Sequence, residues 1–175
     1  MKKKNENAIQ YVDNKKLYAA MVDYITACRK AKDNNKPEIP LYVAQSILLI
    51  SQNLARFYKF SGYSFRDEMI ADGYLACVSY LHNFDIDKWT NPHAYITKVC
   101  YYAFVRRILT ERKQQYVKLR NVQKYMTFEE LLEEGIIPPD LYDNNYDFIR
   151  SYETKLNEKK KKSSKPKGVD AFLEE

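Results

Sequence analysis

Aromatic and basic residues recur at helical spacing along residues 95–113. At 100° per residue they fall on one side of a helix. The series is Tyr95, Lys98, Tyr102, Arg106, Leu109 and Lys113. Cations suit phosphates and flat rings suit unstacked bases, so the stripe predicts a surface for a nucleic-acid strand. An amphipathic helix with tyrosines at the rim of a core and a solvated basic face fits the pattern equally well.

A second pattern is an acidic helix edge next to apolar residues. Glu68 and Asp72 lie one helical turn apart, and Tyr74 and Leu75 follow directly. This mixture could dock on a basic, partly apolar protein surface, although an acidic edge of a helix is more often simply solvated.

The sequence lacks recognisable motifs for catalysis, metal binding or phosphate binding. Its four glycines are not clustered, and neither His82 nor His93 has a second His or Cys at ligand spacing. We expect these histidines to be at the surface or in hydrogen bonds. No serine nucleophile elbow and no Cys-with-His arrangement occurs. An enzyme is not excluded, but we predict a binding protein with no cofactor and no metal.

Composition predicts one intracellular domain with tails. The 175 residues are 45% hydrophobic and 30% charged, and 29 Lys and Arg against 23 Asp and Glu permit an anionic partner. Cys28, Cys77 and Cys100 are odd in number and lie in apolar stretches, which indicates core residues in a reducing compartment. The N-terminus has no apolar run of signal-peptide type and no segment is long enough to span a bilayer, so we expect a cytoplasmic protein.

Helical periodicity without alternating strands predicts an all-α fold. Four helices are expected, at residues 17–32, 41–60, 66–84 and 92–115. Asp13 or Asn14 caps the first, and Asn91 followed by Pro92 opens the fourth.

The C-terminal third shows weaker signals. Thr127 and Glu130 form a capping-box pattern that opens a short helix, and Gly135 would stop it. Residues 138–152 are expected to be loop, and the lysine-rich residues 159–168 to be disordered.

The predicted organisation therefore has five parts. They are an N-terminal tail at 1–13, a compact helical domain at 14–125, a short helix with an irregular segment at 126–158, a flexible linker at 159–168 and a hydrophobic, acidic motif at 169–175.

Two of the helical segments resemble region 2 of bacterial sigma factors. DEMIADGYLACVSYLHNFD and AYITKVCYYAFVRRI align without a gap with that region. Matching or similar positions are Glu68, Ile70, Asp72, Gly73, Phe84, Asp85, Tyr95, Thr97 and Arg106. More narrowly, FSGYSFRDEMIADG, LHNFD and NPHAYIT resemble the late-transcription sigma factors of T4-like bacteriophages. The similarity covers about residues 14–113 and resumes at the C-terminal end.

The resemblance implies two functional surfaces on the helical domain. The segment 68–81 would bind a coiled coil of the largest subunit of host core RNA polymerase, through Glu68, Asp72, Tyr74, Leu75 and Val78. The segment 92–107 would recognise the −10 element of a promoter and open its strands. The candidate DNA-binding residues are Trp89, Tyr95, Lys98, Tyr101, Tyr102, Arg106 and Lys113.

The sequence also departs from the sigma pattern. Lys98 and Val99 replace a Trp-Trp pair, and Thr90 and Pro92 replace two aromatic residues, so strand opening by stacking should be weaker. No second DNA-reading domain follows, so recognition should be confined to a short AT-rich site. Such a factor would need another anchor, and the sequence leaves open whether a co-activator supplies part of it.

The C-terminus would supply that anchor. In the resembled family a hydrophobic and acidic motif inserts into the replication sliding clamp. Val169, Phe172 and Leu173 would fill the clamp pocket, while Asp170, Glu174 and Glu175 would face a basic rim. The lysine-rich tract would then act as a tether. Taken without the resemblance, the motif could equally fold back onto the domain.

We thus expect a phage late-gene sigma factor that acts in the cytoplasm of the infected bacterium. Two alternatives are a DNA-binding regulator that does not act through polymerase and a purely structural helical adaptor. Direct binding through about six phosphates would give a log-log salt slope of about −5 without polymerase, whereas a sigma-like factor should bind free DNA weakly.

Overall fold

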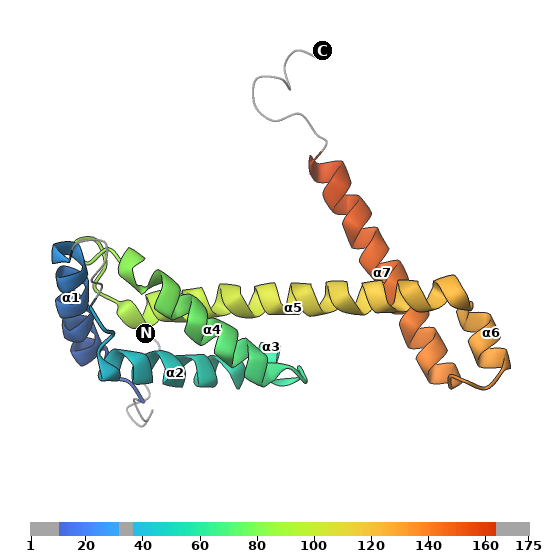
Figure 1. Cartoon of the computed structure of the whole chain (residues 1–175), viewed down its shortest axis with the longest axis horizontal. Coiled ribbons are helices and arrows are strands. Elements are labelled where there is room, and N and C mark those ends of the chain that lie inside the picture. The colour runs from blue at the N-terminus through green and yellow to red at the C-terminus, as the bar shows by residue number, and fades with distance from the viewer. Residues whose placement is uncertain (1–10, 32–36, 164–175) are drawn as a thin grey trace, which may run out of the picture. The chain divides into compact units, whose positions relative to one another are not determined.

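The computed structural model describes residues 11–31 and 37–163 of the chain. All regular structure within those ranges is helical, which confirms the all-α prediction (Figure 1). The chain divides into two units, Met1–Leu109 and Thr110–Glu175. The division falls inside a helix and not at residue 125, the boundary expected from the sequence.

The first unit begins with α1 (Asn14–Lys30) and α2 (Leu41–Ala55). The Asp13 side chain caps α1 as expected, because its Oδ1 accepts hydrogen bonds from the backbone N–H groups of Lys15 and Lys16 at 2.9 and 3.2 Å. Val12, which was assigned to an N-terminal tail, is only 6% exposed and belongs to the core.

The second predicted helix, 41–60, is interrupted. After α2 the backbone of Phe57 is extended, with φ −64° and ψ 143°, and α3 (Tyr58–Ser61) follows as a separate short helix. Phe60 anchors α3, because its ring is buried and makes an edge contact with Phe104 at 5.2 Å between centroids.

The third and fourth predicted helices correspond to α4 (Arg66–Tyr80) and α5 (Pro92–Tyr125). A 3₁₀ turn, η1 (Leu81–Asn83), replaces the expected end of the third helix. The fourth begins at Pro92 as predicted, but it continues ten residues past the expected end at Gln115.

Apolar side chains from α1, α2, α4 and α5 form one core. Its fully buried members include Leu17, Met21, Val43, Ile47, Ile50, Met69, Ile96, Cys100 and Phe104. Cys77 and Cys100 are core residues as predicted, with their Sγ atoms 3.4 Å apart, and burial together with this contact raises the pKa of the Cys77 thiol. The Cys77 thiol therefore stays protonated, and both buried side chains act as packing groups.

Gly73 allows α4 to approach its neighbours closely. A Cβ atom at this position would lie 2.8 Å from Cε1 of Phe104 on α5 and 2.9 Å from Oγ of Ser51 on α2. Ser51 also donates a hydrogen bond to the carbonyl oxygen of Ile70, at 3.1 Å. The glycine is therefore required by packing between helices, since any side chain would force them apart.

The second unit contains the last part of α5, α6 (Phe128–Glu133) and α7 (Pro139–Ser163). The predicted capping box is present: Thr127 and Glu130 satisfy each other's backbone N–H groups at 3.2 and 2.7 Å. Gly135 follows α6 with φ 69°, the left-handed conformation expected of a helix stop.

The prediction of loop at 138–152 is wrong, because these residues lie at the start of α7. The Asp and Asn content suggested loop, but Tyr142, Phe148, Ile149 and Tyr152 recur on one helical face and pack in this unit. The prediction of disorder from Lys159 onward is also wrong for residues 159–163, because α7 continues to Ser163. A small core holds the unit together: Phe128, Leu131 and Ile149 are buried.

Candidate nucleic-acid and protein interfaces

A groove forms in the first unit where the loop before α5 meets the first turns of that helix. Its volume is about 690 Å³. The lining residues are Phe84, Lys88, Trp89, Thr90, Asn91, Ala94, Tyr95, Lys98, Val99 and Tyr102. Four of the seven predicted DNA-binding residues therefore share one groove, namely Trp89, Tyr95, Lys98 and Tyr102. We call it the Trp89 groove.

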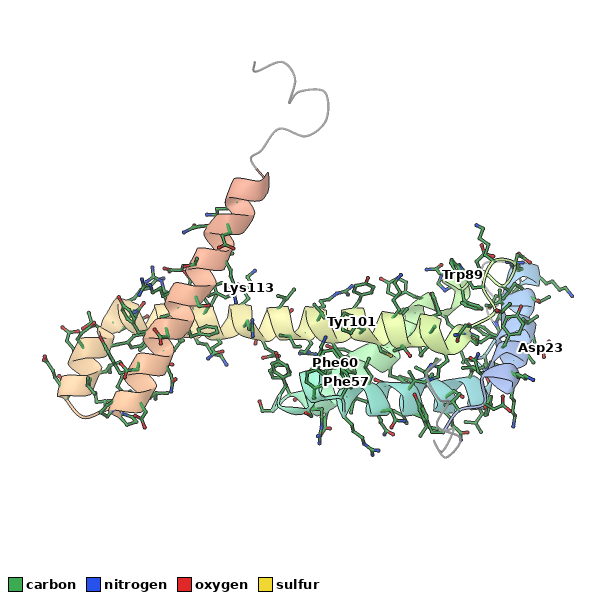
Figure 2. All side chains as sticks on the ribbon, turned by 180° about the vertical axis from the view of Figure 1, so that it is seen from behind. Asp23, Phe57, Phe60, Trp89, Tyr101 and Lys113 are labelled. Carbon is green, nitrogen blue, oxygen red and sulfur yellow. The ribbon has the colours of Figure 1, made fainter. Side chains whose placement is uncertain are left out.

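Local hydrogen bonds fix the loop that forms one wall of the Trp89 groove. The carbonyl oxygen of Asp85 accepts from the backbone N–H groups of Lys88 and Trp89 at 3.3 and 3.0 Å. The Lys88 ammonium lies 3.1 Å from Oδ2 of Asp85 and holds the pKa of that carboxyl group below its usual value. Trp89 stands on this turn with 63% of its surface exposed (Figure 2).

The opposite wall is the start of α5. The Asn91 side chain accepts a hydrogen bond from the N–H of Ala94 at 3.1 Å and caps the helix, as the sequence predicted. Lys98 and Tyr102 follow on the exposed side of α5, and Tyr102 is 58% exposed. The groove therefore joins two cations, Lys88 and Lys98, with two accessible rings.

Tyr95 is held more tightly than the other rings of the groove. Its hydroxyl donates a hydrogen bond to the carbonyl oxygen of Tyr80 at 2.6 Å, and its ring lies 5.2 Å from that of Phe84. Burial raises its pKa above the usual value, so the phenol is neutral at physiological pH. Tyr95 is thus a fixed part of the groove, whereas Trp89 and Tyr102 offer ring surface.

These groups suit an unpaired nucleic-acid strand. Exposed rings can stack on bases, while Lys88 and Lys98 can neutralise phosphates. Lys88 and Thr90 also line this groove. Helical periodicity could not predict them, because they precede the helix. The signal in the sequence was the single Trp, which follows Lys88 directly before the helix.

The remaining predicted DNA-binding residues lie elsewhere. Tyr101 makes an edge contact with Phe60 at 5.7 Å between ring centroids, and Figure 2 shows it beside that residue. Arg106 is exposed further along α5. Lys113 belongs to the second unit. The residues that periodicity placed on one stripe therefore do not form one continuous site.

The two acidic residues on the edge of α4 have different surroundings. Glu68 is exposed, but the carboxylate of Asp72 binds the guanidinium of Arg107 through two contacts, Nε to Oδ2 at 2.6 Å and Nη2 to Oδ1 at 2.9 Å. Asp72 therefore links α4 to α5, in addition to any role at an interface.

The apolar residues of α4 continue onto α2. Leu75 is 61% exposed, and Tyr74 lines a shallow groove of about 310 Å³ with Leu41, Ala44, Gln45 and Leu48. Val78 is partly buried. Leu41 and Leu48, at 72% and 40% exposed, were missed because only the inward side of 41–60 was considered. We call this surface the α2/α4 face.

The candidate sliding-clamp motif, including Val169, Asp170, Phe172, Leu173 and Glu174, lies outside the described residues. Among residues 11–31 and 37–163, no cluster of His, Cys, Asp and Glu could hold a metal ion. Over the same ranges, every helix is too short or too polar to cross a membrane.

Comparison with known proteins adds no family assignment. The chain matches none of the family models, and no curated protein sequence is significantly similar to it.

Proposed function

We propose that the chain is a sigma-like transcription factor that binds bacterial core RNA polymerase and holds one strand of a short AT-rich promoter element. The observation that carries this proposal is the Trp89 groove. Trp89, Lys98 and Tyr102 come from two elements, yet they line one concave site with rings and cations together. That combination suits an unpaired strand better than a duplex, whose bases are stacked.

The α2/α4 face supports the polymerase part of the proposal. Leu41, Tyr74 and Leu75 form an exposed apolar surface next to Glu68. Apolar residues beside a carboxylate fit a partner surface that is basic and partly apolar, as the sigma resemblance implies for the coiled coil of the largest polymerase subunit.

The remaining parts of the proposal rest on the sequence resemblance. The protein would act on late genes in the cytoplasm of an infected bacterium, and Val169, Phe172 and Leu173 would bind the phage sliding clamp. The clamp would add affinity that a single groove lacks. It would need no cofactor and would not be an enzyme.

Co-elution with bacterial core RNA polymerase on size exclusion tests the proposal first, at moderate salt and without DNA. A stable complex supports a sigma-like factor. Absence of a complex, with helix content intact by circular dichroism, contradicts it.

The same Trp89 groove also supports a second candidate, a DNA-binding regulator that works without polymerase. That protein should bind DNA alone, with a log-log salt slope of about −5 if about six phosphates are contacted. A sigma-like factor should instead bind free DNA weakly and with a smaller slope.

A further inference from the structure

Charge is strongly segregated in the second unit. Residues 125–149 contain seven Asp and Glu and no Lys or Arg. Residues 110–124 and 150–163 together contain eleven Lys and Arg against three Glu. One part of this small unit is therefore acidic and the other basic, so a partner of a single charge sign would be attracted to one part and repelled by the other.

The fold brings the two basic segments together. The ring of Tyr116 on α5 stacks on that of Tyr152 on α7, with centroids 4.6 Å apart, and its hydroxyl donates to Oε1 of Glu153 at 2.9 Å. Arg120 also lies 3.6 Å from Glu153. These contacts mark the point where α7 crosses α5 (Figure 1). Beyond it, α7 continues and ends at Ser163.

A groove of about 500 Å³ lies on the α5 side of this crossing. It is lined by Thr110, Lys113, Gln114, Val117 and Lys118, and both lysines are exposed. We call it the Lys113 notch. Its lining has two ammonium groups, an amide and a hydroxyl, but no aromatic ring.

We propose that the Lys113 notch binds the sugar-phosphate backbone of duplex DNA. Lysine, glutamine and threonine side chains are common donors to phosphate oxygens. The lack of a ring distinguishes this notch from the Trp89 groove, since a single strand is held mainly by stacking on aromatic residues. Contacts of this kind carry no sequence information, so the notch would add affinity without specificity.

Duplex DNA fits this charge pattern better than an acidic protein surface does. A duplex carries one negative charge about every 1.7 Å of its axis, so Lys113 and Lys118 can each lie near a phosphate. The acidic residues 125–149 would be repelled by the same duplex and would keep that part of the unit away from it.

This inference rests on the proposed function and deepens it. The second unit would bind the duplex DNA that adjoins the opened promoter element. The inference can fail separately, since binding of free duplex at low salt does not require polymerase. With only a few phosphates contacted, that binding should be weak and should have a slope well below the value for an independent regulator.

The test measures binding of a fluorescein-labelled duplex of about 24 base pairs and mixed sequence by anisotropy, between about 30 and 150 mM KCl. The variant is Lys113→Glu with Lys118→Glu. The matched control is Lys15→Glu with Lys59→Glu, which has the same net charge and changes exposed lysines of the first unit, outside the two basic segments. Lys113→Gln with Lys118→Gln serves as a milder variant if the first fails to fold by circular dichroism.

The notch variant should weaken duplex binding by at least about tenfold at 50 mM KCl and reduce the magnitude of the salt slope by about 2, or about 0.9 per lost contact. The control should stay within about twofold of the natural protein. Equal losses in the two variants, or no loss in the notch variant, would overturn the inference. Loss of polymerase co-elution with unchanged duplex binding would also overturn it, in favour of an acidic protein partner.

Discussion

Asp72 and Arg107 form a two-contact ion pair that joins α4 to α5, with N–O distances of 2.6 and 2.9 Å. Both side chains are about two-thirds buried or more, so the pair is only partly screened by water. The acidic edge suggested an interface, but this carboxylate is also part of the fold. A charge reversal at Asp72 would therefore be a poor test of partner binding, because it would place two cations together.

Asp72→Asn should lower the free energy of unfolding by about 1–2 kcal/mol, since it removes the charge of the α4 carboxylate from the two contacts with the Arg107 guanidinium. Urea denaturation followed by circular dichroism measures the effect. Asp23→Asn, at an exposed position on α1, is the control and should change stability by less than about 0.5 kcal/mol. Equal effects would mean that the Asp72–Arg107 pair contributes little.

Leu75→Asp should weaken polymerase binding without loss of stability. The side chain is 61% exposed, so a carboxylate there costs the fold little, whereas at an apolar interface it would be buried without a partner. The affinity for core polymerase, measured by co-elution over a range of concentrations, should fall at least about tenfold. Leu109→Asp, also at an exposed leucine, should bind normally, and equal losses from the two variants would remove the α2/α4 face from the interface.

Trp89→Ala and Tyr102→Ala should each weaken binding of an AT-rich single strand to the complex with polymerase. Base stacking on an aromatic ring contributes about 1–3 kcal/mol, which corresponds to a loss of about fivefold to 150-fold. Tyr102→Phe should retain binding, because stacking requires the ring and not the hydroxyl. Tyr125→Ala, at a tyrosine 92% exposed in the second unit, is the matched control. Normal binding by both groove variants would contradict the proposed site.

Phe172→Ala with Leu173→Ala should abolish stimulation of transcription by the sliding clamp while polymerase binding persists. The proposed clamp motif and the α2/α4 face are separate parts of the sequence, so the two activities should be separable. Transcription from a promoter template with and without clamp, together with polymerase pull-down, measures both. Parallel loss of the two activities would contradict the separation, and Leu156→Ala, at an exposed leucine outside the motif, is the control.

The sequence predicted the helices of the first unit well because their apolar periodicity, their caps at Asp13 and Asn91 and the breaks at Pro and Gly agree. It failed at α7, where Asp and Asn suggested loop while the spacing of Tyr142, Ile149 and Tyr152 allowed a packed helical face. Local composition was the weaker signal there, because tertiary packing decides such segments.

The functional site was predicted only in part, for a similar reason. Helical periodicity placed Tyr95, Lys98 and Tyr102 on one side of α5, and all three line the Trp89 groove. It could not show that the turn through Lys88 and Trp89 forms the facing wall. It also could not show that Asp72 meets Arg107, because the two residues are 35 positions apart.

The contact between Tyr11 and His93 should make the stability of the fold depend on pH. The Tyr11 hydroxyl lies 2.8 Å from Nε2 of His93, and it donates this hydrogen bond when the neutral ring carries its proton on Nδ1. Burial lowers the pKa of His93 below its usual value of 6.5. The unfolded state therefore binds more protons than the folded state as the pH falls through that range. Stability from this contact is present above pH 6.5 and is lost as the pH falls toward the folded pKa.

His93→Gln should reduce this pH dependence, since an amide can accept the Tyr11 hydrogen bond but does not titrate. Urea denaturation at pH 5.5 and 7.5 compares the two proteins. The titrating carboxylates are the same in both proteins, so their effect on stability cancels in the comparison. The natural chain should therefore lose more stability than the variant on acidification, because only the natural chain has His93. His82→Gln, at an exposed position, should leave the pH dependence unchanged. If His93→Gln and the natural chain lose stability equally between the two pH values, the contact with Tyr11 does not depend on the charge of His93.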